Sequence, residues 1–525
     1  MKKLIALSTS LFILTGCVAA EPNLQEGADY DENVIIDAPI VEESASTDIS
    51  EEVSDVGGQT QEEEVSTSSE PKEDDRGAEI SVVERNSSAV EEGPEEGRLE
   101  VVDAPTNYQL SYETIEDDQC KLVERSYRGS GDARGTAASF PKTPVKFPRT
   151  GNVNIDLIFL EWEDEPKKSS DTRFHRNQAR MFADWVEMVS EGKINVNLKE
   201  HGWFTVPGSA SDFYIPSEWS GGAIIDEVAN AGKNCAIEQC DDILQPILDH
   251  WTSAVDPYID FSSSNMVLFG IPVGSNILED GMYGTGHSPG MDRGGVVRTE
   301  ERHIYDWSAP GNWFMEQTGS PPWVFYAHEW GHSVGLSDFR IVENQFLPKD
   351  EFEFYKVNPM GTYELMDNQG GPTRTITSWL RWVQGWLDDD QVTCVLPEQI
   401  GTNYYELNPL NVVGADNKSI VIKMSDTDAI VVESRRWDPK FDVQVVNNHD
   451  GLIVYTVDAT LGHNEGPLRL QSPRDITKYL RNPYTSPDWR VLDAVLDQGD
   501  FVEVDGIRIE LVDKGSGKDI VKVSR

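Results

Sequence analysis

One short stretch limits the fold of this chain more than any other: residues 327–338, which read AHEWGHSVGLSD. On a helix, residues four positions apart leave the same face, so His328 and His332 would project side by side. Two imidazole nitrogens at that spacing can bind one zinc ion at about 2.0–2.1 Å. Glycine accepts the left-handed conformation that ends helices, so we expect the helix to end at Gly335 and the chain to turn back and bring Asp338 to the same ion. Three protein ligands and one open position are typical of a catalytic zinc site, whereas a structural site has four.

Glu329 follows the first histidine directly and is rotated away from the ligand direction. A carboxylate at that position can hold a metal-bound water and take its proton. The H-E-x-x-H spacing, with glycine and aspartate at the later fixed offsets, is expected by chance in fewer than about one such sequence in ten thousand. We therefore favour a zinc site over the alternative of a buried helix with two hydrogen-bonded histidines.

The stretch resembles the H-E-aromatic-G-H-x-x-G-L-x-D signature of the immune inhibitor A family of secreted bacterial zinc proteases. These enzymes are metzincin-like, and a methionine turn lies beneath their metal. The segment YELMD, residues 363–367, resembles that turn and makes Met366 the candidate methionine. Three later segments also resemble parts of the family: 378–387, 432–435 and 451–455. The resemblance implies an α+β fold, in which a metzincin-like zinc protease domain, a twisted sheet with an active-site helix, precedes a β-rich C-terminal domain.

A different third ligand is also conceivable from the sequence. In thermolysin-type enzymes this ligand is a glutamate some twenty residues beyond the second histidine, and Glu351 and Glu353 fall in that neighbourhood. The residues around them do not have a clear helical pattern, however. Asp338 and Met366 both fit the metzincin-like arrangement, so we expect the aspartate to be the ligand.

The first residues predict export. Two lysines precede an apolar run, Leu4 to Leu14, that is too short to span a bilayer and is typical of a signal peptide. Residues 14–17, LTGC, have the form of a bacterial lipobox, in which Cys17 is acylated and becomes the mature N-terminus. An ordinary secretory signal cut near Ala20 is the alternative. We expect a lipid-anchored protein that faces outwards, at the outer membrane if the cell is Gram-negative, since Val18 follows the cysteine.

Residues 18–104 are expected to form an acidic, disordered tether. Between residues 21 and 100 there are 26 Asp and Glu against four Lys and Arg, with almost no aromatic residues. Such a composition cannot bury enough apolar surface to offset the entropy of ordering the chain. As a flexible coil the segment would reach about 50 Å, enough to hold a domain away from a membrane. A solubilising tail without that purpose is the alternative.

The remaining chain is acidic too, with 66 Asp and Glu against 38 Lys and Arg in residues 101–525. This charge argues against nucleic acid and anionic lipid as partners, so membrane contact would be through the anchor alone. It suits a secreted protein, or one that also binds calcium as a structural ion. We expect a monomer.

A chain of this length exceeds one core and should contain two folded units. We expect a linker or pro-segment-like region at 105–150, the zinc metalloprotease domain at 151–389 and a β-rich, sandwich-like domain at 390–525. Apolar periodicity predicts strands at 153–160, 194–198 and 265–271, and helices at 174–190, 223–231 and 322–334. In the last domain it predicts strands at 419–423, 429–433, 452–458, 501–504 and 507–512.

Four cysteines remain besides Cys17: Cys120, Cys235, Cys240 and Cys394. An even number in an exported chain suggests two disulfides, for which three pairings exist. Cys235 and Cys240 are close enough to close a small loop, which would leave Cys120 for Cys394. A four-cysteine metal site is the weaker alternative, because no C-x-x-C pair is present.

These features predict a zinc-dependent endopeptidase that hydrolyses extracellular proteins or peptides, with Glu329 as general base. Two alternatives remain at this stage. The chain could be a surface adhesin built on a protease-like fold, or its metalloprotease activity could be directed at glycoproteins or mucins.

Overall fold

The computed structural model describes residues 108–111, 117–123, 138–142, 145–213, 237–275, 282–285, 295–311, 321–341, 353–361, 363–369, 373–442, 450–477, 479–481 and 490–525. Contacts divide the chain into two units, Met1–Gly97 and Arg98–Arg525, and every described residue belongs to the second. Several predictions concern residues outside the described ones: the signal peptide and Cys17, the acidic tether, the helix at 223–231, Cys235 and Glu351. The side chain of Cys240 is not described either, so its pairing stays a prediction.

The first half of the second unit is built on a five-stranded sheet with the order β2-β1-β3-β7-β4. Its strands are β1 (Gly151–Glu161), β2 (Ile194–Thr205), β3 (Met266–Gly270), β7 (Asp306–Ala309) and β4 (Met282–Thr285). The first four run parallel, and β4 is antiparallel to β7. The predicted strands at 153–160, 194–198 and 265–271 are β1, β2 and β3.

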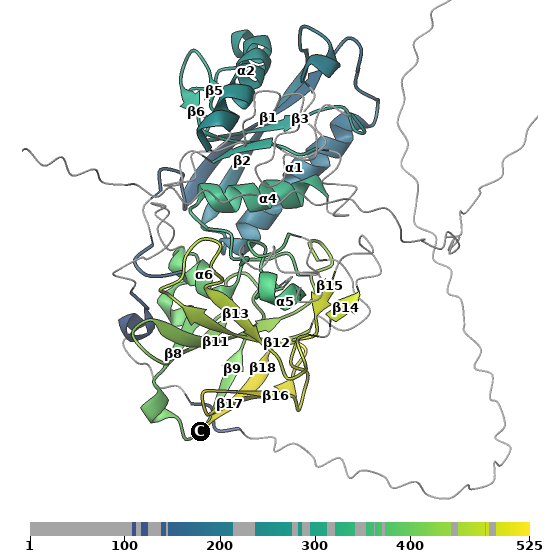
Figure 1. Ribbon diagram of the computed structural model, residues 1–525. Coiled ribbons are helices and arrows are strands. Elements are labelled where there is room, and N and C mark those ends of the chain that lie inside the picture. Colours follow the sequence, from purple (N-terminus) through teal and green to yellow (C-terminus); the bar gives the residue numbers. More distant parts are fainter. Residues whose placement is uncertain are drawn as a thin grey trace, which may run out of the picture. The chain divides into compact units, whose positions relative to one another are not determined.

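Helices cover both faces of this sheet (Figure 1). They are α1 (Asp171–Val189), α2 (Ile237–Val255) and α4 (Pro322–Ser333). Along β1, Leu157 and Phe159 belong to the hydrophobic core that also contains residues of α1 and α4. The residues between and after them, Ile158 and Leu160, belong to a second core with residues of α2. Strands buried on both faces are the rule where helices connect parallel strands, which explains the nearly continuous apolar run in β1.

The second half is β-rich, as expected, and contains two larger sheets, β13-β12-β11-β10-β8 and β16-β17-β18-β9. The first contains β8 (Val392–Val395), β10 (Ser419–Lys423), β11 (Asp428–Arg435), β12 (Gly451–Asp458) and β13 (Leu468–Gln471). The second contains β9 (Thr402–Leu407), β16 (Phe501–Val504), β17 (Ile507–Lys514) and β18 (Asp519–Ser524). Buried side chains of both sheets form one core cluster, so the sheets face each other. The predicted strands at 501–504 and 507–512 are β16 and β17, and Asp505 and Gly506 join them in a tight hairpin with φ of 51° and 77°.

Short elements complete the described structure. They are the strands β5 (Val297–Arg298), β6 (His303–Ile304), β14 (Tyr479–Arg481) and β15 (Arg490–Leu492), and the helices α5 (Phe354–Val357) and α6 (Ser378–Val383). Single 3₁₀ turns lie at Asp117–Cys120, Ala210–Phe213, Asp256–Tyr258, Asp389–Gln391 and Pro397–Gln399. Within the described part of the chain, no helix combines the length and the apolar character that a membrane crossing requires.

The described residues before β1 are held firmly to the rest of the unit. Cys120 forms a disulfide with Cys394 of β8, so the pairing expected for these two cysteines is confirmed. Further along, the indole of Trp379 donates to the carbonyl of Ala138 at 2.7 Å. The disulfide joins positions 274 residues apart, so it ties the start of the described chain to the first β-rich sheet.

Candidate metal centre

Helix α4 carries the histidine pair and is buried on every side, with all twelve of its residues in the buried class. It begins at Pro322, where a proline's missing N–H costs nothing. Trp330 packs edge-to-face on Trp185 of α1, with ring centroids 5.9 Å apart, and stacks on Trp386 at 5.4 Å. A helix enclosed by aromatic side chains has little freedom to shift, so it can present its polar residues at fixed positions.

The helix ends as the sequence predicts. Gly335 has a φ of 87°, the left-handed conformation that favours glycine. Its N–H donates to the carbonyl of His332, and the N–H of Leu336 donates to that of Gly331, both at 2.8 Å. These two bonds form a Schellman motif, which satisfies carbonyls at the helix end and reverses the chain direction. The reversal brings the next residues back toward the histidines.

His328, His332 and Asp338 come together at this point. One ligand atom from each residue lies within 4.8 Å of the others. Asp338 Oδ1 is 3.2 Å from His328 Nε2 and 3.7 Å from His332 Nε2. Two ligands of a tetrahedral zinc ion, each bound at about 2.0–2.1 Å, are about 3.3 Å apart, so the spacing fits such an ion. This set leaves a fourth position to a ligand from outside the protein, as catalytic zinc sites do.

The hydrogen bonds of both imidazoles also fit a metal. His328 Nδ1 lies 3.2 Å from the carbonyl oxygen of Leu365, and His332 Nδ1 lies 2.9 Å from that of Leu336. A carbonyl oxygen only accepts, so each Nδ1 carries a proton, and Nε2 is the ring nitrogen that can bind a metal. Such bonds fix the tautomer and the orientation of metal-binding histidines.

The charge states of His332 and Asp338 also fit a metal site. Burial lowers the pKa of His332 to about 3, so the ring is neutral at ordinary pH, which is the form that binds metal. The second carboxylate oxygen of Asp338 lies near a cation, with Oδ2 3.9 Å from Arg340 Nη2. Arg340 is half-exposed, so it adds to the orientation of the carboxylate without a strong ion pair.

Glu329 lies on α4 beside the triad, with only 3% of its surface exposed. Among the described residues, the group that can hold a metal does not include it. Its place next to a ligand, but outside the ligand set, fits the expected role of a base.

Met366 packs against α4 at Gly331, which lies between His328 and His332 in the sequence. A methyl group added at Gly331 would lie 2.5 Å from Met366 Sδ. The backbone of the turn around Met366 makes two nearby contacts: the Leu365 carbonyl accepts from His328, and the Met366 carbonyl accepts the N–H of Phe339, the residue after Asp338, at 3.0 Å. Met366 therefore contacts the helix that carries the histidines, and its role as a methionine turn stays a prediction.

The rival ligand and the other described histidines lie elsewhere. Glu353 pairs with Lys356 at 3.4 Å and is absent from the metal-binding group found among the described residues. His175 and His250 each contact a backbone carbonyl at 2.6 Å, and His201 contacts Asp156 at 2.7 Å. These three histidines therefore have hydrogen-bond partners away from the metal centre.

His463 is the exception, and sequence reasoning missed it. Its Nδ1 accepts the backbone N–H of Asp338 at 3.2 Å, although the two residues are 125 positions apart. Nothing distinguishes His463 in the sequence, where it stands in an ordinary turn-forming stretch, GHNEGP. Arg340 was missed for the same reason.

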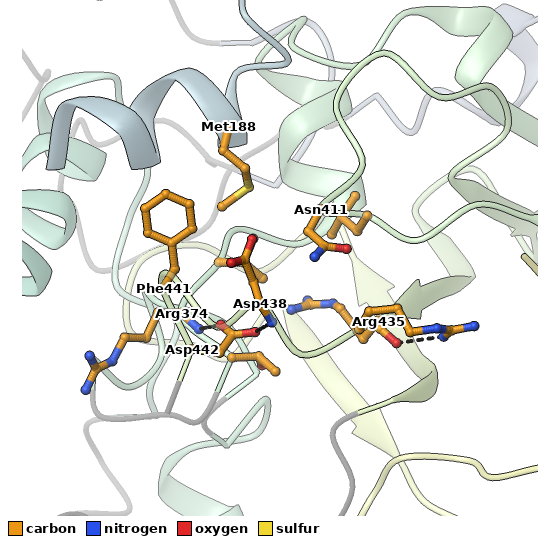
Figure 2. Close-up of a pocket in the computed structure, with 11 residues that line it drawn as sticks. Met188, Arg374, Asn411, Arg435, Asp438, Phe441 and Asp442 are labelled. Carbon is orange, nitrogen blue, oxygen red and sulfur yellow. Dashed lines mark hydrogen bonds between the residues drawn. The ribbon is translucent and has the colours of Figure 1, made fainter. Parts of the chain in front are cut away.

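A small cavity of about 20 Å³ lies away from this centre, in contact with α1 and the loop after β11 (Figure 2). Asp442 lies between two backbone donors there, the N–H of Arg374 at 3.0 Å and that of Asp438 at 2.9 Å. The space suits a single water molecule and no organic substrate. The metal centre is therefore the better candidate for chemistry.

Comparison with known proteins adds little to this geometry. No protein-family model and no curated protein matches the sequence. Among solved structures, the chain is similar to wild-type OgpA from Akkermansia muciniphila, with 12% identical residues, a coverage of 66% of this chain and 96% of that chain, and a TM-score of 0.22. A TM-score this low does not establish a common fold, so the interpretation of the site rests on the residues of this chain.

Proposed function

We propose that this protein is a zinc-dependent endopeptidase. The observation that carries the proposal is the convergence of His328, His332 and Asp338 beside a buried Glu329. Two imidazoles, one carboxylate and an open fourth position are the donor set of hydrolytic zinc sites. Zinc, when bound, supplies a Lewis acid that polarises a carbonyl and makes a water molecule more acidic.

The other roles, which are metal binding, orientation of the imidazoles and proton transfer, belong to residues of the chain. His328, His332 and Asp338 would hold the ion, and the carbonyls of Leu365 and Leu336 keep both imidazoles in the binding tautomer. Glu329 would take a proton from the attacking water and pass it to the nitrogen that leaves the cleaved peptide. Its burial supports this role, since the carboxylate is held beside the ligands and away from bulk water.

A metzincin-like arrangement is the form of this proposal that the geometry favours. Met366 beneath Gly331, and Asp338 in place of a later glutamate, support it. The resemblance to the immune inhibitor A family implies the same arrangement. We further propose extracellular proteins as substrates and a lipid anchor at Cys17, which the lipobox and the acidic segment after it support.

The test compares zinc content and casein cleavage in full-length variants. Glu329→Gln should keep zinc and lose about a hundred- to ten-thousand-fold in cleavage rate, the usual cost of removing a general base. Asp338→Ala should lose zinc and activity together. Glu353→Ala and Glu300→Gln, at an exposed position, serve as controls and should change neither. Full cleavage by Glu329→Gln would end the protease proposal, and loss of zinc from Glu353→Ala with Asp338→Ala unaffected would move the third ligand.

A further inference from the structure

Asp338 differs from the two histidines in how its position is fixed. His328 and His332 lie on a buried helix, whereas Asp338 lies in an irregular segment after the helix end. A residue outside regular structure keeps backbone freedom that metal binding would have to remove. The aspartate can therefore act as an effective ligand only if other contacts hold its backbone.

Those contacts come from the β12–β13 loop, residues 459–467, in the β-rich half of the unit. His463 Nδ1 accepts the N–H of Asp338 at 3.2 Å, and the N–H of Asn464 donates to the carbonyl of Asp338 at 2.8 Å. The loop thus holds the backbone of Asp338 through both its donor and its acceptor.

The same loop is packed closely against the chain beyond the ligand. A methyl group added at Gly466 would lie 2.7 Å from Ile341 Cγ1 and 3.2 Å from Pro359 Cγ. Gly466 also has a φ of 69°, which favours glycine. This close approach leaves the loop little room to move relative to Asp338, so its two hydrogen bonds can define the ligand's position.

We propose that His463 is a positioning residue of the metal centre and that the β12–β13 loop is part of that centre. The inference rests on the proposed zinc site. Through the peptide of Asp338, His463 sets the carboxylate opposite the two imidazoles. Because Nδ1 is the acceptor, the ring carries its proton on Nε2, and the acceptor role belongs to the nitrogen nearer the backbone.

That assignment gives a matched pair of substitutions. The Oδ1 of asparagine lies at about the same distance from the backbone as Nδ1 of histidine, and it accepts hydrogen bonds. The Oε1 of glutamine lies one bond further out. His463→Asn should therefore preserve the acceptor, whereas His463→Gln and His463→Ala should lose it. His303→Ala, at an exposed position in β6, is the control.

The experiment measures zinc affinity of the full-length proteins by competition with a chromophoric chelator, and the visible absorption of their cobalt-substituted forms. Loss of a partner that orients a ligand typically weakens metal binding by about 10- to 100-fold. We expect that loss, with a changed cobalt spectrum, in the Ala and Gln variants. The Asn and His303→Ala variants should bind as the wild type does. Thermal unfolding of the metal-free proteins checks that all variants fold.

The outcomes separate this inference from the proposed function. If the wild type binds zinc tightly and all His463 variants bind it equally well, the positioning role is wrong and the zinc site stands. Equal weakening in the Asn and Gln variants would also overturn the Nδ1 assignment. If the wild type itself does not bind zinc, the proposed function fails. If His463→Ala does not fold, the difference in zinc affinity between the Asn and Gln variants still tests the positioning role.

Discussion

Gly331 provides the sharpest test of how Met366 supports the histidine pair. It lies on α4 between His328 and His332, and a Cβ there would be 2.5 Å from Met366 Sδ and 3.1 Å from Cε. Met366 has no exposed surface, so its side chain cannot move out into solvent. Gly331→Ala therefore forces either Met366 or the helix to shift.

Two opposing effects set the size of the change. Replacing a glycine by alanine inside a helix stabilises it by about 0.8–1 kcal/mol. Forcing an extra carbon into a packed core costs about 1–3 kcal/mol. In the wild type the sum should lower the free energy of unfolding by up to about 2 kcal/mol. In a Met366→Ala background the sulfur and terminal methyl are absent, so Gly331→Ala should raise it by about 1 kcal/mol.

The assay is urea unfolding of the wild type, both single variants and the double variant, with zinc affinity measured in parallel. The diagnostic result is the change of sign between the two backgrounds, because no effect confined to Gly331 can produce it. Gly202→Ala in β2 is the control, since a methyl group there meets no atom within 4 Å. If Gly331→Ala changed stability by the same amount in both backgrounds, Met366 would not be the group beneath α4.

Three further changes test other features. Glu191→Gln should lower the free energy of unfolding in urea by about 3–5 kcal/mol, because it removes a carboxylate that lies 3.3 Å from buried Arg381 and 2.5 Å from buried Lys418. Glu187→Gln, at an exposed position, is the control and should have little effect. Burial raises the pKa of Glu364 to about 7, so the folded state holds a proton that the unfolded state releases above about pH 4.5. Stability should therefore fall by about 3 kcal/mol as pH rises from about 4.5 to about 7, and unfolding measured across this range should show a smaller fall in Glu364→Gln. Cys17→Ser should release the protein from the membrane fraction, and a variant that stays bound would refute the lipid anchor.

Local patterns predicted much of this structure because local forces decide them. Apolar periodicity predicted the bounds of β10, residues 419–423. The proline before α4 and the glycine after it predicted the bounds of that helix to within one residue. The two histidines could be placed together because helix geometry alone sets their separation. The turn at Gly335 followed from the freedom of glycine to adopt positive φ.

Contacts between distant segments could not be predicted in this way. Trp185, Trp330 and Trp386 stand far apart in the chain, yet their indoles enclose one helix. Each tryptophan in the sequence signals only an apolar position. Which aromatic residues meet depends on how the sheets and helices pack, and one sequence does not contain that information.

The third ligand shows where the local argument ends. The distance from Gly335 to Asp338 allows the aspartate to reach the metal, but a short irregular segment also allows many other conformations. The structure restricts them with His463 and Asn464, from a loop between two strands of the β-rich half. The motif therefore identifies which side chains can bind the ion, while the strength of that binding depends on a part of the chain that the motif does not contain. On this reasoning the β-rich half is part of the metal centre. A chain that ended at Leu387 would keep His328, His332 and Asp338, but it would lose the two hydrogen bonds that hold the backbone of Asp338.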